Sequence, residues 1–178
     1  NLKVVDIQLN DINGGSFRVV VQHKDKSLDN KSREYITKLQ EKEKNLNLST
    51  NQPFDDFIIK INDEKDKLVT FIKNEVSAGK TVHCYGASTK GNTLLQFYNL
   101  DKKLIQFIAD KNPDKWGRKT IGTDISIISE EESHSMNPDY FLILPWHFIN
   151  EFKEREKNYL KNGGRLLVPL PKFKIIQA

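Results

Sequence analysis

The sequence predicts an α/β fold: a three-layer, Rossmann-like domain with a mainly parallel sheet, preceded by a β-hairpin and a helical linker. In the second half of the 178 residues, short apolar segments alternate with helical ones. This alternation is typical of parallel strands that helices cover on both faces. A glycine-containing turn, GASTKGN at 86–92, follows the first apolar segment. Hydrophobic residues make up 37% of the chain, enough to form the core of one such domain.

The first thirty residues predict the hairpin. Segments 4–9 and 17–22 have strand-forming patterns, and NGGS at 13–16 between them is a turn signal. Residues 24–30 are polar and predict a linker.

Two helices are expected next. Ser32 is expected to cap the first, which runs to about Leu46, and a polar loop follows at 47–56. Asn62 is expected to cap a longer helix that stops at Gly79. The chain therefore divides into three expected parts: the hairpin at 1–30, the helical linker at 31–61 and the sheet domain at 62–178.

The sheet domain is expected to alternate strands with helices. The expected strands are 81–85, 104–109, 139–144, 165–168 and an edge strand at 173–176, with a short extended piece at 121–128. The expected helices are 92–100 and 148–161. In an open parallel sheet, ligands bind at the carboxyl ends of strands, where the strand order reverses.

Composition excludes several classes of function. The net charge of +4 comes without clusters of basic residues, so no nucleic-acid partner is expected. No apolar run is long enough for a membrane span. The single cysteine, Cys84, falls in an expected strand and suits a reducing cytoplasm. The four histidines lack metal-ligand spacing, so no metal is expected in this chain.

The glycine turn predicts a site for a phosphate group. A turn from a buried strand into a helix presents unpaired N–H groups and a partial positive charge to an anion. The turn lacks the lysine of a nucleoside-triphosphatase loop, since Asn92 stands there, and Ser88 replaces the middle glycine of the dinucleotide pattern. Alternatively, the glycines only shape a tight turn. The candidate pyrophosphate contacts are Gly86, Ser88, Thr89, Lys90, Gly91 and Asn92.

Two further loops are expected at the same edge of the sheet. Asp110 ends the second strand, about twenty residues past the glycine turn, where Rossmann-like folds place an acid for ribose hydroxyls. Lys111 and Lys115 follow it and are candidate nucleoside contacts. His147, in the LPWHF segment after the third strand, is a candidate substrate contact, because imidazole can donate or accept a hydrogen bond.

Five separated motifs resemble the C-terminal domain of the nucleotide-sugar C-methyltransferases of deoxysugar biosynthesis. They are GGSFR, YGASTKGNTLLQ, IADKNPDKWGRKTIGT, DYFLILPWHF and GGRLLVPLP. The resemblance implies a domain that holds a nucleoside-diphosphate sugar, of thymidine type, with GASTKGN at the pyrophosphate. It also implies that Arg18, near the seam with a preceding methyltransferase domain, lies close to the substrate.

The same resemblance implies that the chain is one piece of a longer enzyme. The family's zinc-binding part, its S-adenosylmethionine loop and its catalytic Tyr/Glu/His cluster have no counterpart here, so no catalytic residue is assigned. We expect S-adenosylmethionine to be held by the missing domain and this chain alone to be inactive. Two alternatives stay open: an NAD(P)-binding oxidoreductase domain and a non-catalytic nucleotide-binding module.

Overall fold

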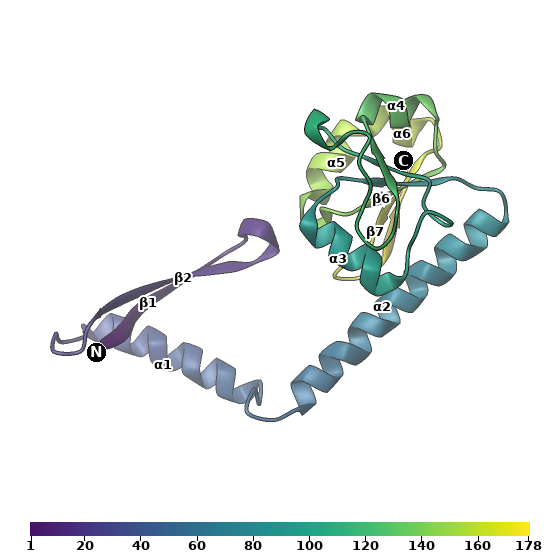
Figure 1. Cartoon of the computed structure of the whole chain (residues 1–178). Helices are drawn as coiled ribbons and strands as arrows, with labels where there is room; N and C mark the ends of the chain where they lie inside the picture. The colour runs from purple at the N-terminus through teal and green to yellow at the C-terminus, as the bar shows by residue number, and fades with distance from the viewer. The chain divides into compact units, whose positions relative to one another are not determined.

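The computed structural model describes all 178 residues and divides them into two units, Asn1–Ile59 and Lys60–Ala178 (Figure 1). Each unit is described by itself. No helix in either one is both long and apolar enough to cross a membrane.

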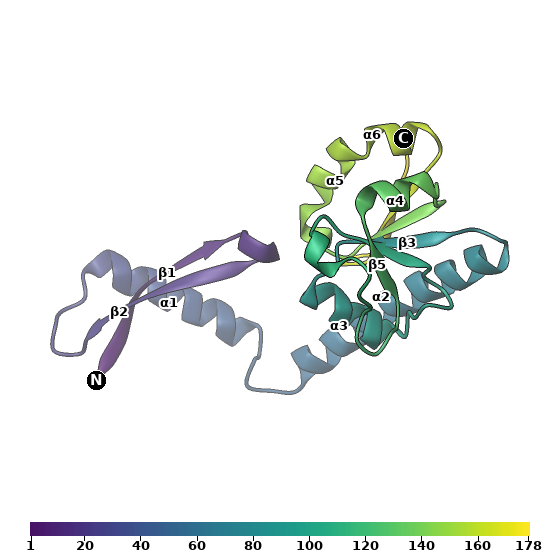
Figure 2. The same ribbon diagram turned by 45° about the horizontal axis from the view of Figure 1, so that its top comes forward.

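The first unit is a hairpin with a helix alongside it. β1 (Leu2–Asn10) pairs antiparallel with β2 (Ser16–His23), which confirms the predicted hairpin. The turn between them contains the 3-10 helix η1 (Ile12–Gly14), and it uses positive φ angles at Asn13 and the two glycines that follow. α1 (Asn30–Asn45) runs beside the hairpin and contacts β1 (Figure 2).

The cap of α1 differs from the sequence prediction. Asp29, not Ser32, is the N-cap, and its carboxylate accepts hydrogen bonds from both the N–H and the hydroxyl of Ser32. An ionised carboxylate is a strong acceptor and also favours the positive end of the helix dipole, so it displaces the serine from this role.

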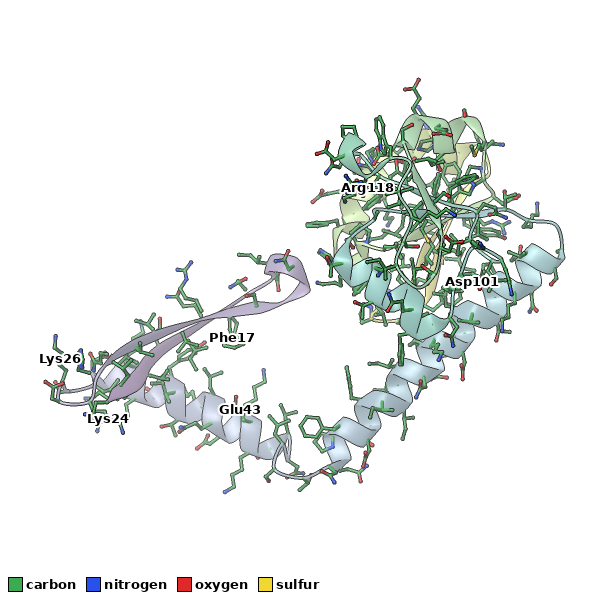
Figure 3. All side chains as sticks on the ribbon, viewed as in Figure 1. Phe17, Lys24, Lys26, Glu43, Asp101 and Arg118 are labelled. Carbon is green, nitrogen blue, oxygen red and sulfur yellow. The ribbon has the colours of Figure 1, made fainter.

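The first unit has no hydrophobic core. Every one of its residues is exposed or only partly buried. Phe17, labelled in Figure 3, stands out from the hairpin with 67% of its surface exposed. Three successive valines of β2 (Val19, Val20 and Val21) are also exposed.

α2 (Gln52–Ser77) is longer than predicted. Asn62 lies inside this helix and is not its cap, and the loop expected over 47–56 ends early. Pro53 falls in the first turn, where proline needs no N–H partner and its fixed φ suits a helix start. The buried residues of α2, Leu68 and Ile72, both belong to the second unit.

The second unit contains a six-stranded sheet with the order β5-β4-β3-β6-β7-β8. Its strands are β3 (Val82–Tyr85), β4 (Phe107–Ala109), β5 (Ser126–Ile128), β6 (Tyr140–Ile143), β7 (Arg165–Val168) and β8 (Lys174–Ile176). All neighbours are parallel except β7 and β8, so the predicted edge strand is confirmed. The chain moves from β3 to β4 and β5 on one side, then returns to β6 on the other. The strand order therefore reverses between β3 and β6.

Helices cover both faces of this sheet, which confirms the three-layer prediction. α2 and α3 (Thr89–Tyr98) pack on one face, where Ile72 and Leu95 share a core with Cys84 of β3. α5 (Ile149–Arg155) and α6 (Lys157–Lys161) pack on the other through Phe152 and Leu160. The remaining helices are α4 (Glu130–Ser135), η2 (Pro113–Lys115) and η3 (Trp146–Phe148).

Two helix boundaries in this unit correct the sequence prediction. α3 begins at Thr89 instead of residue 92, because Ser88 caps it. The single helix expected over 148–161 is divided at Glu156 into α5 and α6.

Candidate functional site

Three loops meet at the carboxyl edge of the sheet. They follow β3, β4 and β6, so they begin at Gly86, Asp110 and Leu144. β3 is the strand between the other two. The loops therefore surround the point where the strand order reverses, which is where open α/β sheets bind ligands.

The two glycines of the β3–α3 turn have structural roles. Gly86 has a φ of +85°, and a Cβ there would lie 2.9 Å from Pro145 Cδ. A Cβ at Gly91 would lie only 2.7 Å from Leu144 Cβ. Both glycines thus let the turn and α3 approach the end of β6. Their presence is explained without a ligand, so any phosphate site depends on the residues between them.

Much of the turn's hydrogen-bonding capacity is already used. The Ser88 hydroxyl accepts from the N–H of Gly91 at 3.0 Å, and the N–H of Ala87 donates to Asp110 Oδ2 at 2.7 Å. Thr89 is the first residue of α3, so no carbonyl of the helix precedes it to accept a hydrogen bond from its N–H. The helix start can still bind an anion, but fewer N–H groups are free to donate to it than the sequence predicted.

Asp110 holds two of the loops together. Its carboxylate is buried and accepts from Ala87 N–H, from Lys115 Nζ at 3.0 Å and from Asn112 N–H at 2.8 Å. Lys115 Nζ also donates to the carbonyl of Ala87 at 2.8 Å. A carboxylate has about four acceptor positions, which leaves one for a ligand hydroxyl. We call this arrangement of Asp110, Lys115 and Ala87 the loop clamp.

Two neighbours of the clamp, Lys111 and Trp116, are both exposed. The indole Nε1 of Trp116 donates to the Asp110 carbonyl at 2.7 Å, while 44% of the residue remains exposed. Sequence analysis assigned Trp116 no role beyond its place in the motif IADKNPDKWGRKTIGT. The signal for its anchoring role was its place six residues after the strand-ending acid.

Lys90 and His147 come together at the mouth of the site. Lys90 Nζ lies 5.8 Å from the centroid of the Trp146 ring, a cation–π distance. His147 Nδ1 is buried without a hydrogen-bond partner. Burial and the nearby Lys90 charge lower the pKa of His147. The imidazole is therefore neutral at pH 7 and can serve as a hydrogen-bonding group for a ligand.

Asn92, one turn into α3, also carries an unpartnered atom. Its Oδ1 is buried and accepts no hydrogen bond. Asn92 lines a cavity of about 280 Å³ next to the β3–α3 turn. Buried polar atoms in proteins are nearly always paired, so this oxygen indicates a position for a donor from outside the chain.

The other sequence candidates lie elsewhere or are inert. Arg18 belongs to the first unit, where its guanidinium donates to Gln8 Oε1 at 3.3 Å. Cys84 is fully buried, and burial raises the pKa of its thiol, so it is no nucleophile. No group of three or more His, Cys, Asp or Glu side chains is placed to hold a metal ion.

A charged cluster on the α5 face of the sheet was not predicted. Glu156 is only 4% exposed and accepts from Tyr85 OH at 3.0 Å. His134 Nε2 lies 3.1 Å from its other oxygen, and Arg155 also contacts it. Burial alone would raise the pKa of Glu156, but the hydrogen bonds from His134 and Tyr85 outweigh it and lower that pKa. The hydrogen bond to Glu156 raises the pKa of His134.

Comparison with known proteins places these features in a family. The profile of the family described as the C-methyltransferase C-terminal domain matches residues 11–171. The chain is also 32% identical over 177 residues to the C-methyltransferase NovU of Streptomyces niveus. That alignment covers 99% of this chain but only 42% of the relative, so the chain spans less than half of the relative's length.

Proposed function

Because the chain belongs to the C-methyltransferase C-terminal domain family, we propose that it is the substrate-holding domain of an S-adenosylmethionine-dependent sugar C-methyltransferase. Its substrate is a nucleoside-diphosphate keto-deoxysugar, with thymidine as the expected nucleoside. The observation that carries the proposal is the set of three loops at the reversal of strand order, with unpartnered polar atoms on Asn92 and His147.

Each loop has its own part in this proposal. The helix start at Ser88 and Thr89, the ammonium of Lys90 and the amide of Asn92 bind the pyrophosphate, while Gly86 and Gly91 let the turn form. The loop clamp offers its last acceptor position to the ribose, with Lys111 and Lys115 beside the nucleoside. His147, neutral at pH 7, contacts the sugar part of the substrate. Arg18, in the first unit, is a separate candidate for a substrate contact.

The chain's contribution to catalysis is positioning. In the proposed reaction, a base removes a proton from the carbon beside the sugar keto group, and that carbon then forms a bond to a methyl group. S-adenosylmethionine supplies the methyl group as an electrophilic sulfonium and leaves as the neutral thioether. Holding two reactants in place can supply roughly 7–11 kcal/mol of the barrier reduction. We assign the base and the methyl-donor site to the part of the enzyme outside these 178 residues.

In this proposal, the first unit connects a preceding methyltransferase domain to the nucleotide-sugar domain. Residues 1–30 form the hairpin tail of a preceding methyltransferase domain, residues 31–61 the helical linker and residues 62–178 the nucleotide-sugar domain. A two-stranded hairpin alone is at best marginally stable in water. The absence of any buried residue in the first unit, together with the exposure of Phe17 and Val21, supports a covering domain. A buried single thiol, Cys84, agrees with a cytoplasmic location.

A thermal-shift titration of the 178-residue chain tests the ligand. A nucleoside diphosphate at 100 times its Kd should stabilise the second unit by about 2.7 kcal/mol. S-adenosylmethionine and NADH should each leave the unfolding temperature unchanged. Stabilisation by S-adenosylmethionine but not by the nucleotide would refute the assignment. Stabilisation by NADH would favour an oxidoreductase domain, which Ser88 at the middle glycine position of the dinucleotide pattern argues against.

A further inference from the structure

An apolar groove of about 350 Å³ lies between α2 and α3 in the second unit, and we call it the α2–α3 groove. Its walls come from both helices and from the loops that follow β6 and β7. The apolar residues of these walls are Ile61, Leu94, Phe97, Tyr98, Trp146 and Leu170. Phe97 is 48% exposed. Water contact with a concave apolar surface is unfavourable, and such surfaces often mark interaction sites.

One polar group among these walls has no partner within the chain. Tyr98 is only 2% exposed, and its hydroxyl is buried without a hydrogen-bond partner. Buried tyrosine hydroxyls are usually paired. The nearby carboxylate of Glu64 is engaged elsewhere, since it accepts from the N–H of Phe173 and pairs with Lys67 Nζ at 2.9 Å. A polypeptide segment in the groove would bring main-chain carbonyls, which can accept the hydrogen bond that Tyr98 lacks.

A cation stands over one aromatic wall of the groove. Lys65 Nζ lies 4.9 Å from the centroid of the Phe97 ring. Lys65 follows Ile61 by four residues on α2, so the two side chains share one face of that helix. The ammonium group has three donors and no acceptor, and its charge attracts a carboxylate. The groove is therefore complementary to an apolar segment that has an acidic neighbour.

The position of the groove favours another part of the same enzyme as its occupant. The alignment covers 42% of the relative NovU, so more than half of that protein has no counterpart in this chain. The proposed function assigns the methyl donor and the base to the part outside these 178 residues, and this part has to reach the sugar. Trp146 forms one end of the groove and is adjacent to His147, the proposed sugar contact, with 6.1 Å between the two ring centroids.

We propose that the methyltransferase part of the enzyme docks on the α2–α3 groove by inserting an apolar side chain. A main-chain carbonyl of the inserted segment accepts from the Tyr98 hydroxyl, and an acidic residue beside it pairs with Lys65. This inference rests on the proposed function, because only that proposal supplies the second part. Docking covers Trp146 and thereby holds the loop of His147 in place while the methyl donor is brought to the sugar.

Amide hydrogen exchange in the 178-residue chain and in the longer enzyme tests whether the groove is covered. Peptides from residues 93–98 of α3 should exchange about tenfold more slowly in the longer enzyme, because docking suppresses local opening. Peptides from α5, on the opposite face of the sheet, should exchange equally in both. Equal exchange of α3 in the two proteins would overturn the docking proposal. Failure of the chain to bind a nucleoside diphosphate would instead overturn the proposed function, so the two failures are distinguishable.

Variants assign the effect to the groove. In the longer enzyme, Phe97→Glu should lower kcat of methyl transfer about tenfold, because a small misplacement of two reactants has a large effect on rate. The same substitution in the 178-residue chain should leave the affinity for a nucleoside diphosphate and the urea midpoint unchanged. Met136→Glu, at a position that is 45% exposed and does not line the groove, is the matched control and should behave as wild type.

A second pair of variants tests the rim cation. Lys65→Glu should also lower kcat and speed the exchange of α3 in the longer enzyme, whereas Lys73→Glu, exposed on the same helix and outside the groove, should do neither. Full methyl transfer by both Phe97→Glu and Lys65→Glu would overturn the proposal. Sedimentation that shows the 178-residue chain to dimerise, and Phe97→Glu to be monomeric, would assign the groove to a second copy and would overturn it as well.

Discussion

Substituting Gly91 by alanine tests the close packing of α3 on the end of β6. The new Cβ would lie 2.7 Å from Leu144 Cβ and 2.9 Å from Leu144 Cδ1. The nearer contact involves an atom attached directly to the backbone, so a side-chain rotation cannot relieve it. Overpacking of this kind costs about 1–3 kcal/mol. Alanine also favours a helix over glycine by about 1 kcal/mol, so we expect a net loss of up to about 2 kcal/mol.

Urea unfolding followed by tryptophan fluorescence measures this loss. Both tryptophans, Trp116 and Trp146, lie in the second unit, so the signal reports the unit that contains Gly91. Thr93→Ala, at an exposed position of the same helix, is the control for helix propensity and should be close to wild type in stability. Gly91→Ala should lower the urea midpoint without changing the slope. A variant as stable as wild type would mean that helix propensity prevails and that α3 can move away from Leu144.

The remaining predictions concern charge and catalysis. Lys90→Ala should weaken pyrophosphate binding by about 1–3 kcal/mol in calorimetry, as expected for a charge-assisted hydrogen bond; the same loss in Lys103→Ala would point to a general charge effect. The His134–Glu156 pair should stabilise the second unit most between about pH 4.5 and 6.5, the ordinary pKa values of the two groups. Its raised pKa means that His134 contributes fully below 6.5 and loses its contribution as pH rises through the folded value. Glu156, whose pKa is lowered, contributes above 4.5 and loses its contribution as pH falls through its folded value. Urea midpoints measured against pH should show this maximum, and His134→Gln should flatten its alkaline side; an unchanged profile would refute the coupling. The 178-residue chain should transfer no radiolabelled methyl group to any nucleotide sugar. In the longer enzyme that we propose, His147→Ala should raise KM more than it lowers kcat, and the reverse pattern would place His147 in the chemical step.

The sheet could be predicted from the sequence because its strands are short apolar runs between strong turn signals. Tyr140–Ile143 is buried at every position, as a central parallel strand requires. Helix starts were harder to predict, since several residues near each start are able to cap. Asp29 and Ser88 compete with neighbours of the same type, and only the backbone geometry decides between them.

The positions of the loops that carry the candidate residues were predicted, but their hydrogen bonding was not. The glycine turn, Asp110 and His147 all lie on loops at the expected edge of the sheet. The sequence does not reveal that Asp110 uses most of its acceptor capacity on Ala87, Lys115 and Asn112. The Glu156 cluster was missed for a similar reason. A glutamate inside a helical pattern is typical of a solvated position, and only tertiary packing buries it.

The loop clamp constrains how domains of this design can diverge during evolution. Replacing Asp110 would remove the proposed ribose contact and would also release the turn that forms the start of α3, so one substitution would affect both ligand binding and local structure. Ile121, which lines the cavity beside this turn, has no such double role, because its side chain is exposed and its backbone carbonyl accepts the hydrogen bond from Gln96. New ligand preferences should therefore arise by substitution around Ile121, while the carboxylate at Asp110 stays fixed.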